Sequence, residues 1–334
     1  MGKENKLIEL LDKFENMLFS NSSIFLDYDE LEEIILYYFN DAEIYKAKKA
    51  IQLAHNLYPK SINIFILESE ILIQAGKIDE ALLLIDNIFA DNKESKDLLF
   101  QKAKILNKLK KYKKSNKFLK QITESKELNF FILDLMLKNY MNLEDYHNAI
   151  VVNKKILQIF PDDKSYFDKF ISCIHLSEKI DDGISFLNEF LEKNPYSYNG
   201  WYEIGKLFEK LNRLNESITA QEFAIISHES FAPSYLELGK LYEKKGDFKK
   251  SIYYYKVVMN LNKGSSFCLY RLSKCYEKIG EYDNSINFLN KIVENDPLYE
   301  KAWISIAKHY LRNNDHDKAI LNLNKALEII SNNY

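Results

Sequence analysis

The chain repeats a single pattern every 34 residues from Tyr28 to Asn333, with no insertion or deletion between nine consecutive blocks. The fourth and eleventh positions of a block are always bulky, as in Trp201 and Phe208. The twentieth position is always very small, namely Ala47, Ala81, Ser115, Ala149, Gly183, Ser217, Ser251, Ser285 and Ala319. A fixed period of this length indicates a repeat architecture, in which each unit packs on its neighbours.

Two helices are predicted in every block. Apolar residues fall at positions 4, 7, 8 and 11 and again at 20, 21, 24, 27 and 28, which is the spacing of one helical face. Between the two stretches, Gly76, Gly246 and Gly280 predict the end of a first helix. The residues predicted to be N-caps of the second helices are Asp79, Asp181, Asn215, Asp283 and Asp317. The small residue at position 20 allows the two antiparallel helices to approach closely.

This pattern resembles the tetratricopeptide repeat, in which Trp, Leu, Gly, Tyr, Ala, Phe, Ala and Pro recur at fixed offsets over 34 residues. The resemblance is strong at Trp201, Gly205 and Phe208 and weak in the fifth block, where Ile171 holds a small-residue position. It implies an all-α fold, a right-handed superhelical α-solenoid of antiparallel helix pairs. The expected repeats span 28–61, 62–95, 96–129, 130–163, 164–197, 198–231, 232–265, 266–299 and 300–333.

The two ends of the array differ. Residues 1–27 are predicted to contain a capping helix over residues 4–20, whose apolar face consists of Leu7, Ile8, Leu11, Phe14 and Leu18. In the last predicted helix, we expect Leu323, Leu327 and Ile330 to lie uncovered. This apolar face could associate with a second copy of the chain or with a partner. Alternatively, it remains partly exposed to solvent without any binding role, and the sequence does not distinguish the two.

Composition and motifs argue against several functions. The sequence has no HExxH, no GxSxG and no phosphate-binding Gly-rich loop, so we expect no enzyme activity and neither a cofactor nor a metal. Cys173, Cys268 and Cys275 are an odd number and are predicted to be reduced core thiols. No apolar run reaches the roughly 18 residues of a membrane span, and we expect that the N-terminal residues are not a signal peptide. We therefore expect a cytoplasmic protein.

The resemblance places the partner-binding surface on the concave face, which is lined by positions 2, 5, 9, 12 and 13 of the first helices. The candidate binding residues at positions 5 and 9 are Lys104, Lys138, Tyr202, Lys206, Lys240, Tyr270, Lys274 and Lys308. Blocks one and two place acidic residues on the corresponding face, among them Glu32 and Glu70. Such a groove suits a segment that carries acidic residues. Alternatively, the lysines only solvate an open helix face.

The predicted function is a non-enzymatic protein–protein interaction scaffold that holds a protein or peptide segment in its concave groove. The alternative is RNA binding, in which the lysines contact phosphates and the tyrosines stack on bases. A net charge of −3 and the glutamates at position 12, which include Glu209, Glu243 and Glu277, argue against RNA. The identity of the partner does not follow from the sequence.

Overall fold

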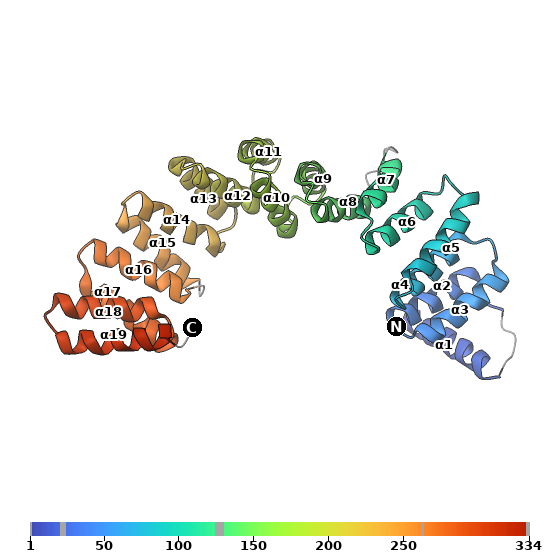
Figure 1. Ribbon diagram of the computed structural model, residues 1–334, viewed down its shortest axis with the longest axis horizontal. Coiled ribbons are helices and arrows are strands. Elements are labelled where there is room, and N and C mark those ends of the chain that lie inside the picture. Colours follow the sequence, from blue (N-terminus) through green and yellow to red (C-terminus); the bar gives the residue numbers. More distant parts are fainter. Residues whose placement is uncertain (1, 21–24, 124–129, 262–263, 332–334) are drawn as a thin grey trace. The chain divides into compact units, whose positions relative to one another are not determined.

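The computed structural model describes residues 2–20, 25–123, 130–261 and 264–331 of the chain. These residues form nineteen α-helices and no strand (Figure 1). The helices are α1 (Gly2–Ser20), α2 (Tyr28–Asn40), α3 (Ile44–Leu57), α4 (Ile62–Gln74), α5 (Ile78–Asp91), α6 (Lys96–Lys108), α7 (Tyr112–Thr123), α8 (Phe130–Asn142), α9 (Tyr146–Ile159), α10 (Lys164–Leu176), α11 (Ile180–Lys193), α12 (Tyr198–Lys210), α13 (Leu214–Ser227), α14 (Ala232–Lys244), α15 (Phe248–Asn260), α16 (Ser266–Lys278), α17 (Tyr282–Asn295), α18 (Glu300–Arg312) and α19 (His316–Ser331). The predicted all-α fold of repeated helix pairs is confirmed.

The small residues at position 20 lie where the second helix of a pair crosses the first. Each of them is buried. The hydroxyl of Ser217 donates a hydrogen bond of 2.7 Å to the main-chain carbonyl of Gly205, and Ser251 donates one of 2.8 Å to that of Gly239. A serine hydroxyl reaches a carbonyl of another helix only where the two helices cross closely, so the periodic small residues serve to bring the paired helices together.

Glycine ends three of the first helices, as predicted. Gly76, Gly246 and Gly280 have φ angles of +77°, +80° and +83°, a left-handed conformation that glycine adopts without a steric penalty.

The predicted N-caps of the second helices are wrong by two residues. Asp79, for example, is the second residue of α5, which begins at Ile78, and Asp181 occupies the same place in α11. The helices begin earlier because the turn that follows each first helix is very short. The N-cap position instead holds Asp247 before α15, whose side chain accepts a hydrogen bond from the main-chain amide of Lys250. Carboxylates in the first turn still interact favourably with the helix dipole.

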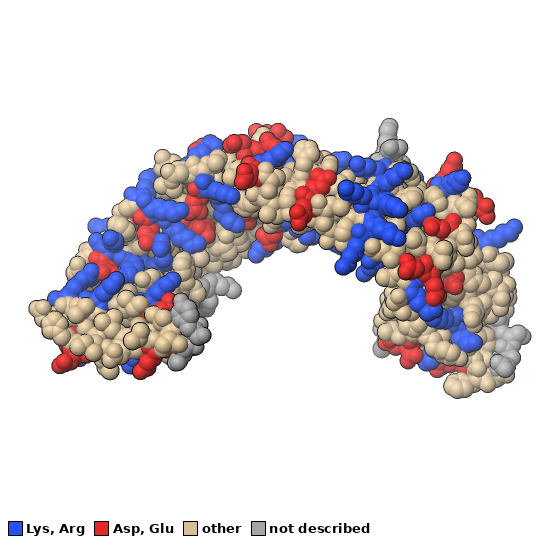
Figure 2. Space-filling view, in the orientation of Figure 1, with Lys and Arg blue, Asp and Glu red and all other residues tan. Residues whose placement is uncertain are grey.

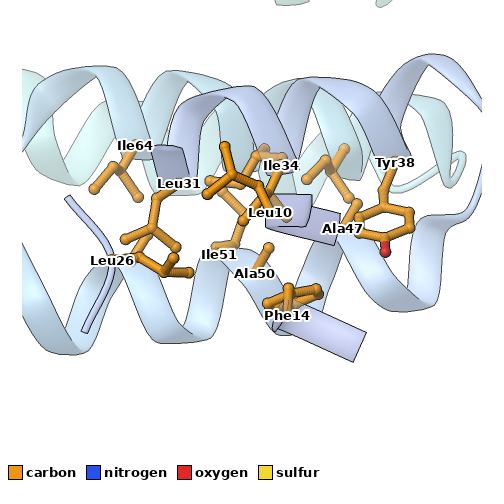
Figure 3. Close-up of a cluster of buried hydrophobic side chains, with 13 residues drawn as sticks. Leu10, Phe14, Leu26, Leu31, Ile34, Tyr38, Ala47, Ala50, Ile51 and Ile64 are labelled. Atoms are coloured by element: carbon orange, nitrogen blue, oxygen red, sulfur yellow. The ribbon is translucent and has the colours of Figure 1, made fainter. Parts of the chain in front are cut away.

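The chain divides into two compact units, Met1–Ile156 and Leu157–Tyr334, and each is described by itself. In the first unit, α1 packs against α2 and α3. Leu10 and Phe14 of α1 are buried among Leu31, Tyr38 and Ala47 (Figure 3). Nζ of Lys46 in α3 lies 2.8 Å from Oε1 of Glu15 in α1, and this ion pair links the two helices.

One residue of the predicted apolar face of α1 is misplaced. Ile8 is exposed, whereas Leu10 is buried. Leu10 and Phe14 are four residues apart and therefore share a helical face, which turns Ile8 toward solvent. Leu11 and Leu18 are partly buried against the same cluster, as expected.

In the second unit, the predicted exposed face of the last helix is present. Leu323, Leu327 and Ile330 of α19 are all exposed. The predicted core thiols are confirmed too, since Cys173, Cys268 and Cys275 are buried and free.

Candidate functional site

A pocket of about 500 Å³ lies between α12 and α14 in the second unit. Its lining consists of Tyr202, Ser230, Phe231, Ala232, Pro233, Leu236, Glu237 and Val258. Tyr202 is the one predicted site residue in this lining. Most of the wall is apolar or aromatic, with the carboxylate of Glu237 as its charged group, so the pocket can accept an apolar side chain of a bound segment.

Tyr202 is held firmly at the edge of this pocket. Its ring meets that of Phe231 edge to face, with 5.4 Å between the ring centroids. Its main-chain carbonyl accepts a hydrogen bond of 3.0 Å from Nε2 of Gln221, which belongs to the paired helix α13. Burial, followed by the nearby charge of Glu237, raises the pKa of the phenol well above its usual range. Tyr202 therefore stays neutral and presents a rigid aromatic surface.

Lys206 lies one helical turn after Tyr202, and its Nζ is 5.0 Å from the centre of the Tyr202 ring. The same ammonium group lies 3.1 Å from Oε2 of Glu203. Glu203 is only 4% exposed. Burial raises the pKa of its carboxyl group, although Lys206 opposes that shift. Lys206 thus stabilises a buried carboxylate as well as facing solvent.

Lys240 repeats this arrangement on the next first helix. Its Nζ lies 2.8 Å from Oε1 of Glu237, the acidic residue of the pocket. It also lies 5.6 Å from the ring centre of Phe267 on α16. The pocket, Tyr202, Lys206 and Lys240 therefore form one continuous surface over α12 and α14.

Tyr270 and Lys274 continue the surface on α16. Nζ of Lys274 lies 5.7 Å from the Tyr270 ring centre and 2.8 Å from Oε2 of Glu277. Lys308 of α18 is exposed, and no ion pair joins it to another residue that the structure describes. We refer to Tyr202, Lys206, Lys240, Tyr270 and Lys274 as the Tyr–Lys face.

Ion pairs also link successive first helices across this surface. Glu209 of α12 pairs with Lys244 of α14. Glu243 of α14 lies 2.8 Å from Arg271 of α16, and Glu277 of α16 lies 2.5 Å from Arg312 of α18. The glutamates at position 12 therefore bind the neighbouring helix, so positive and negative charges alternate along the surface.

The two predicted lysines of the first unit are also paired. Lys104 of α6 contacts Glu70 of α4. Lys138 of α8 lies 2.7 Å from Asp134 on its own helix and remains mostly exposed.

Sequence reasoning missed Phe231 and Tyr299, which stand at position 34, the last of a block. Phe231 packs on Tyr202, and Tyr299 lies with its ring centre 5.7 Å from that of Tyr270. In both cases an aromatic residue follows the position-5 tyrosine by 29 residues. This pairing of a position-5 tyrosine with an aromatic residue at position 34, which occurs in these two blocks, is the signal that would have located the pocket.

The described residues contain no group of three or more His, Cys, Asp and Glu side chains placed to hold a metal ion. A helix both long and apolar enough to cross a membrane is likewise absent from the described part of the chain.

The periodic sequence and the helix pairs define an all-α repeat solenoid. Residues 232–264 and 300–333 match one family model described as tetratricopeptide repeat, and residues 267–299 match another. These three segments of the chain therefore match tetratricopeptide repeats. No curated protein sequence matches it.

Several solved structures are similar to parts of the chain. The crystal structure of MamA is 21% identical with a TM-score of 0.46, and the match covers 48% of this chain and 94% of that one. YrrB, titled a TPR protein with an unusual peptide-binding site, is 18% identical with a TM-score of 0.45, over 53% of this chain and 91% of that one. The Cut9–Hcn1 structure is 15% identical with a TM-score of 0.43, over 96% of this chain and 64% of that one.

Proposed function

We propose that the protein is a non-enzymatic interaction scaffold whose Tyr–Lys face binds a segment of a partner protein. The observation that supports this most directly is the pocket beside Tyr202, because a recessed apolar site on a repeat surface suits a side chain of a bound chain. Aromatic residues at its edge provide contact area at a low cost in conformational entropy. The YrrB structure, described as that of a peptide-binding TPR protein, is consistent with this role.

The chemistry of the surface defines the segment that it would bind. An apolar or aromatic side chain would enter the pocket between Tyr202 and Leu236. Acidic residues next to it would approach Lys206 and Lys240, but there they compete with Glu203 and Glu237. We therefore expect the apolar anchor to contribute more affinity than the acidic residues, and binding to weaken moderately with salt.

Selection from a library of phage-displayed random peptides tests the proposal. The full chain should enrich peptides with a common apolar or aromatic residue. Lys206→Glu/Lys240→Glu should weaken binding of the selected peptides by about tenfold or more. The matched control is Lys249→Glu/Lys256→Glu, which makes the same charge change on exposed positions of α15.

Two results would contradict the proposal. One is the absence of a common residue among the selected peptides. The other is equal binding by the two charge-reversed variants, since the surface around Tyr202 would then contribute nothing. A partner, a cytoplasmic location and a preference for acidic segments all remain predictions.

RNA binding is the less supported function. Lysines that contact phosphate groups should be free, whereas Lys206, Lys240 and Lys274 each pair with a carboxylate. Binding of a single-stranded RNA homopolymer that weakens steeply with salt and is lost in Lys206→Glu/Lys240→Glu would favour RNA instead.

Self-association through α19 is a separate proposal. Leu323, Leu327 and Ile330 form an exposed apolar strip on this helix. Sedimentation of the full chain over a range of concentrations tests it. A strict monomer at the highest concentration would exclude this role.

A further inference from the structure

A second site lies in the first unit, in the most basic part of the sequence. Residues 98–123 contain no Asp or Glu, although the net charge of the whole chain is −3. The lysines of this stretch are Lys102, Lys104, Lys108, Lys110, Lys111, Lys113, Lys114, Lys117 and Lys120. Figure 2 shows basic side chains gathered over the part of the first unit that contains α7. This local positive charge lies outside the Tyr–Lys face.

Part of this stretch lines a pocket of about 520 Å³ between α7, α8 and α9. The lining consists of Lys113, Asn116, Lys117, Lys120, Tyr140, Leu143, Asp145 and Asn148. Lys113, Lys117 and Lys120 follow helical spacing, so they stand on one side of α7. All three are exposed. Among the ion pairs of the described residues, none involves Lys113 or Lys117.

The acidic residue of the lining is already engaged. Oδ1 of Asp145 accepts a hydrogen bond of 3.2 Å from the main-chain amide of Asn148, and Oδ2 accepts one of 2.7 Å from the Asn148 side chain. Asp145 precedes α9, so its charge also faces the positive end of that helix dipole. With three lysines and one aspartate, the lining has a net charge of +2.

A buried hydrogen-bond donor adds to the positive charge. Asn116 is only 4% exposed, and its Nδ2 has no hydrogen-bond partner among the described residues. Its Oδ1 accepts a bond of 2.8 Å from Nδ2 of Asn139. Oδ1 of Asn139 in turn accepts a bond of 2.7 Å from Asn107, which sets the orientation of the Asn139 amide. The network therefore leaves the buried N–H groups of Asn116, a residue of the pocket lining, without an acceptor among the described residues.

We propose that this pocket binds a small soluble compound that carries phosphate groups. Phosphate oxygens accept hydrogen bonds from lysine ammonium groups and from a side-chain amide, and their negative charge is complementary to the ammonium groups of Lys113 and Lys117 in the lining. A buried donor without an acceptor costs stability, and a ligand oxygen near Asn116 would remove that cost. A volume of this size fits a small molecule.

A flat docking surface for an acidic protein would explain fewer of these observations. Such a surface needs exposed charge, which the lysines provide, but it has no need of a recessed donor such as Asn116. Binding of phosphate groups on lipids would use the same lysines, so the experiment must separate the two sources of phosphate.

Isothermal titration calorimetry of the full chain with inorganic pyrophosphate tests the proposal. We expect saturable binding of one pyrophosphate per chain, which weakens with added salt. Lys113→Gln/Lys117→Gln should reduce the affinity by about tenfold or more, since two charged contacts are lost. The control Lys111→Gln/Lys114→Gln removes the same charge from the same stretch but outside the lining, and it should change the affinity by less than about threefold.

Amide hydrogen exchange shows where on the chain pyrophosphate binds. Pyrophosphate should slow exchange in α7 and at the start of α9, and it should leave α14 unchanged. In a parallel arm, vesicles that contain phosphatidic acid replace pyrophosphate. Absence of saturable pyrophosphate binding, equal losses in the two double variants, or binding to vesicles alone would each overturn the proposal.

Discussion

Gly239→Ala gives a direct test of the close crossing between α14 and α15. A Cβ atom at this position would lie 2.5 Å from Cε1, 2.7 Å from Cδ1 and 2.9 Å from Cζ of Tyr255. The Tyr255 ring is fully buried, and its hydroxyl donates a hydrogen bond of 3.1 Å to Glu243. Carbon atoms in contact are normally about 3.5 Å apart or more, so the ring must retreat by about 1 Å.

Two opposing effects set the magnitude. Overpacking of a buried ring typically costs about 1–3 kcal/mol. Replacing a glycine inside a helix by alanine contributes about 1 kcal/mol of stability. We therefore expect Gly239→Ala to destabilise the second unit by about 1 kcal/mol, and by no more than about 2 kcal/mol.

A double-mutant cycle separates these effects. In a Tyr255→Leu background the ring is gone, so Gly239→Ala should now stabilise by about 0.5–1 kcal/mol. The assay is amide hydrogen exchange of α14 and α15, because repeat proteins unfold locally and a single global transition does not report one repeat. If Gly239→Ala slows exchange in the otherwise unchanged protein, the close-crossing explanation of the small residues is refuted.

Two further predictions concern ionisable groups. Burial raises the pKa of the Cys268 and Cys275 thiols to about 11. Neither thiol should therefore react with a thiol reagent in the native protein at pH 8, whereas both should react after denaturation. Rapid reaction of the native protein would contradict the placement of these thiols in the core. Burial raises the folded-state pKa of Glu203 above its unfolded value, so its contribution to stability is largest below the unfolded pKa and falls as pH rises through the folded pKa. The stability of Glu203→Gln relative to the unchanged protein should therefore increase between pH 4 and pH 7, as measured by amide hydrogen exchange of α12 relative to intrinsic exchange rates, and a constant difference would exclude a raised pKa.

The structure brings some of the predicted site residues together. Tyr202, Lys206 and Lys240 were predicted together, and they do form a continuous surface with the pocket. Among the predicted lysines, Lys138, Lys206, Lys240 and Lys274 pair with a carboxylate on their own helix, and Lys104 pairs with Glu70 of a neighbouring helix. Pairs at i,i+3 or i,i+4 spacing can be expected from the sequence, whereas a pair such as Lys104 with Glu70 depends on the distance between two helices, which a sequence does not contain.

The contacts of the two pocket linings could not be predicted from the sequence either. Phe231 precedes α14 and packs on Tyr202 of α12, although the two residues belong to opposite ends of a block. The orphan donor of Asn116 depends on a hydrogen-bond chain through Asn139 and Asn107, which come from two different helices. Periodicity places such residues on helices, but it does not pair them.

The amino-acid sequence by itself determined the period, the helix pairs and the close crossing, because a helix exposes a regular face and only small residues at position 20 let two such faces meet. It also predicted the helix ends at Gly76, Gly246 and Gly280, since the left-handed conformation there is a local property of the backbone. The tertiary structure alone decided the charge pairs between different helices, the pocket beside Tyr202 and the unpaired amide of Asn116. Each of these depends on how side chains from separate helices meet, and that is set by the packing of the whole unit.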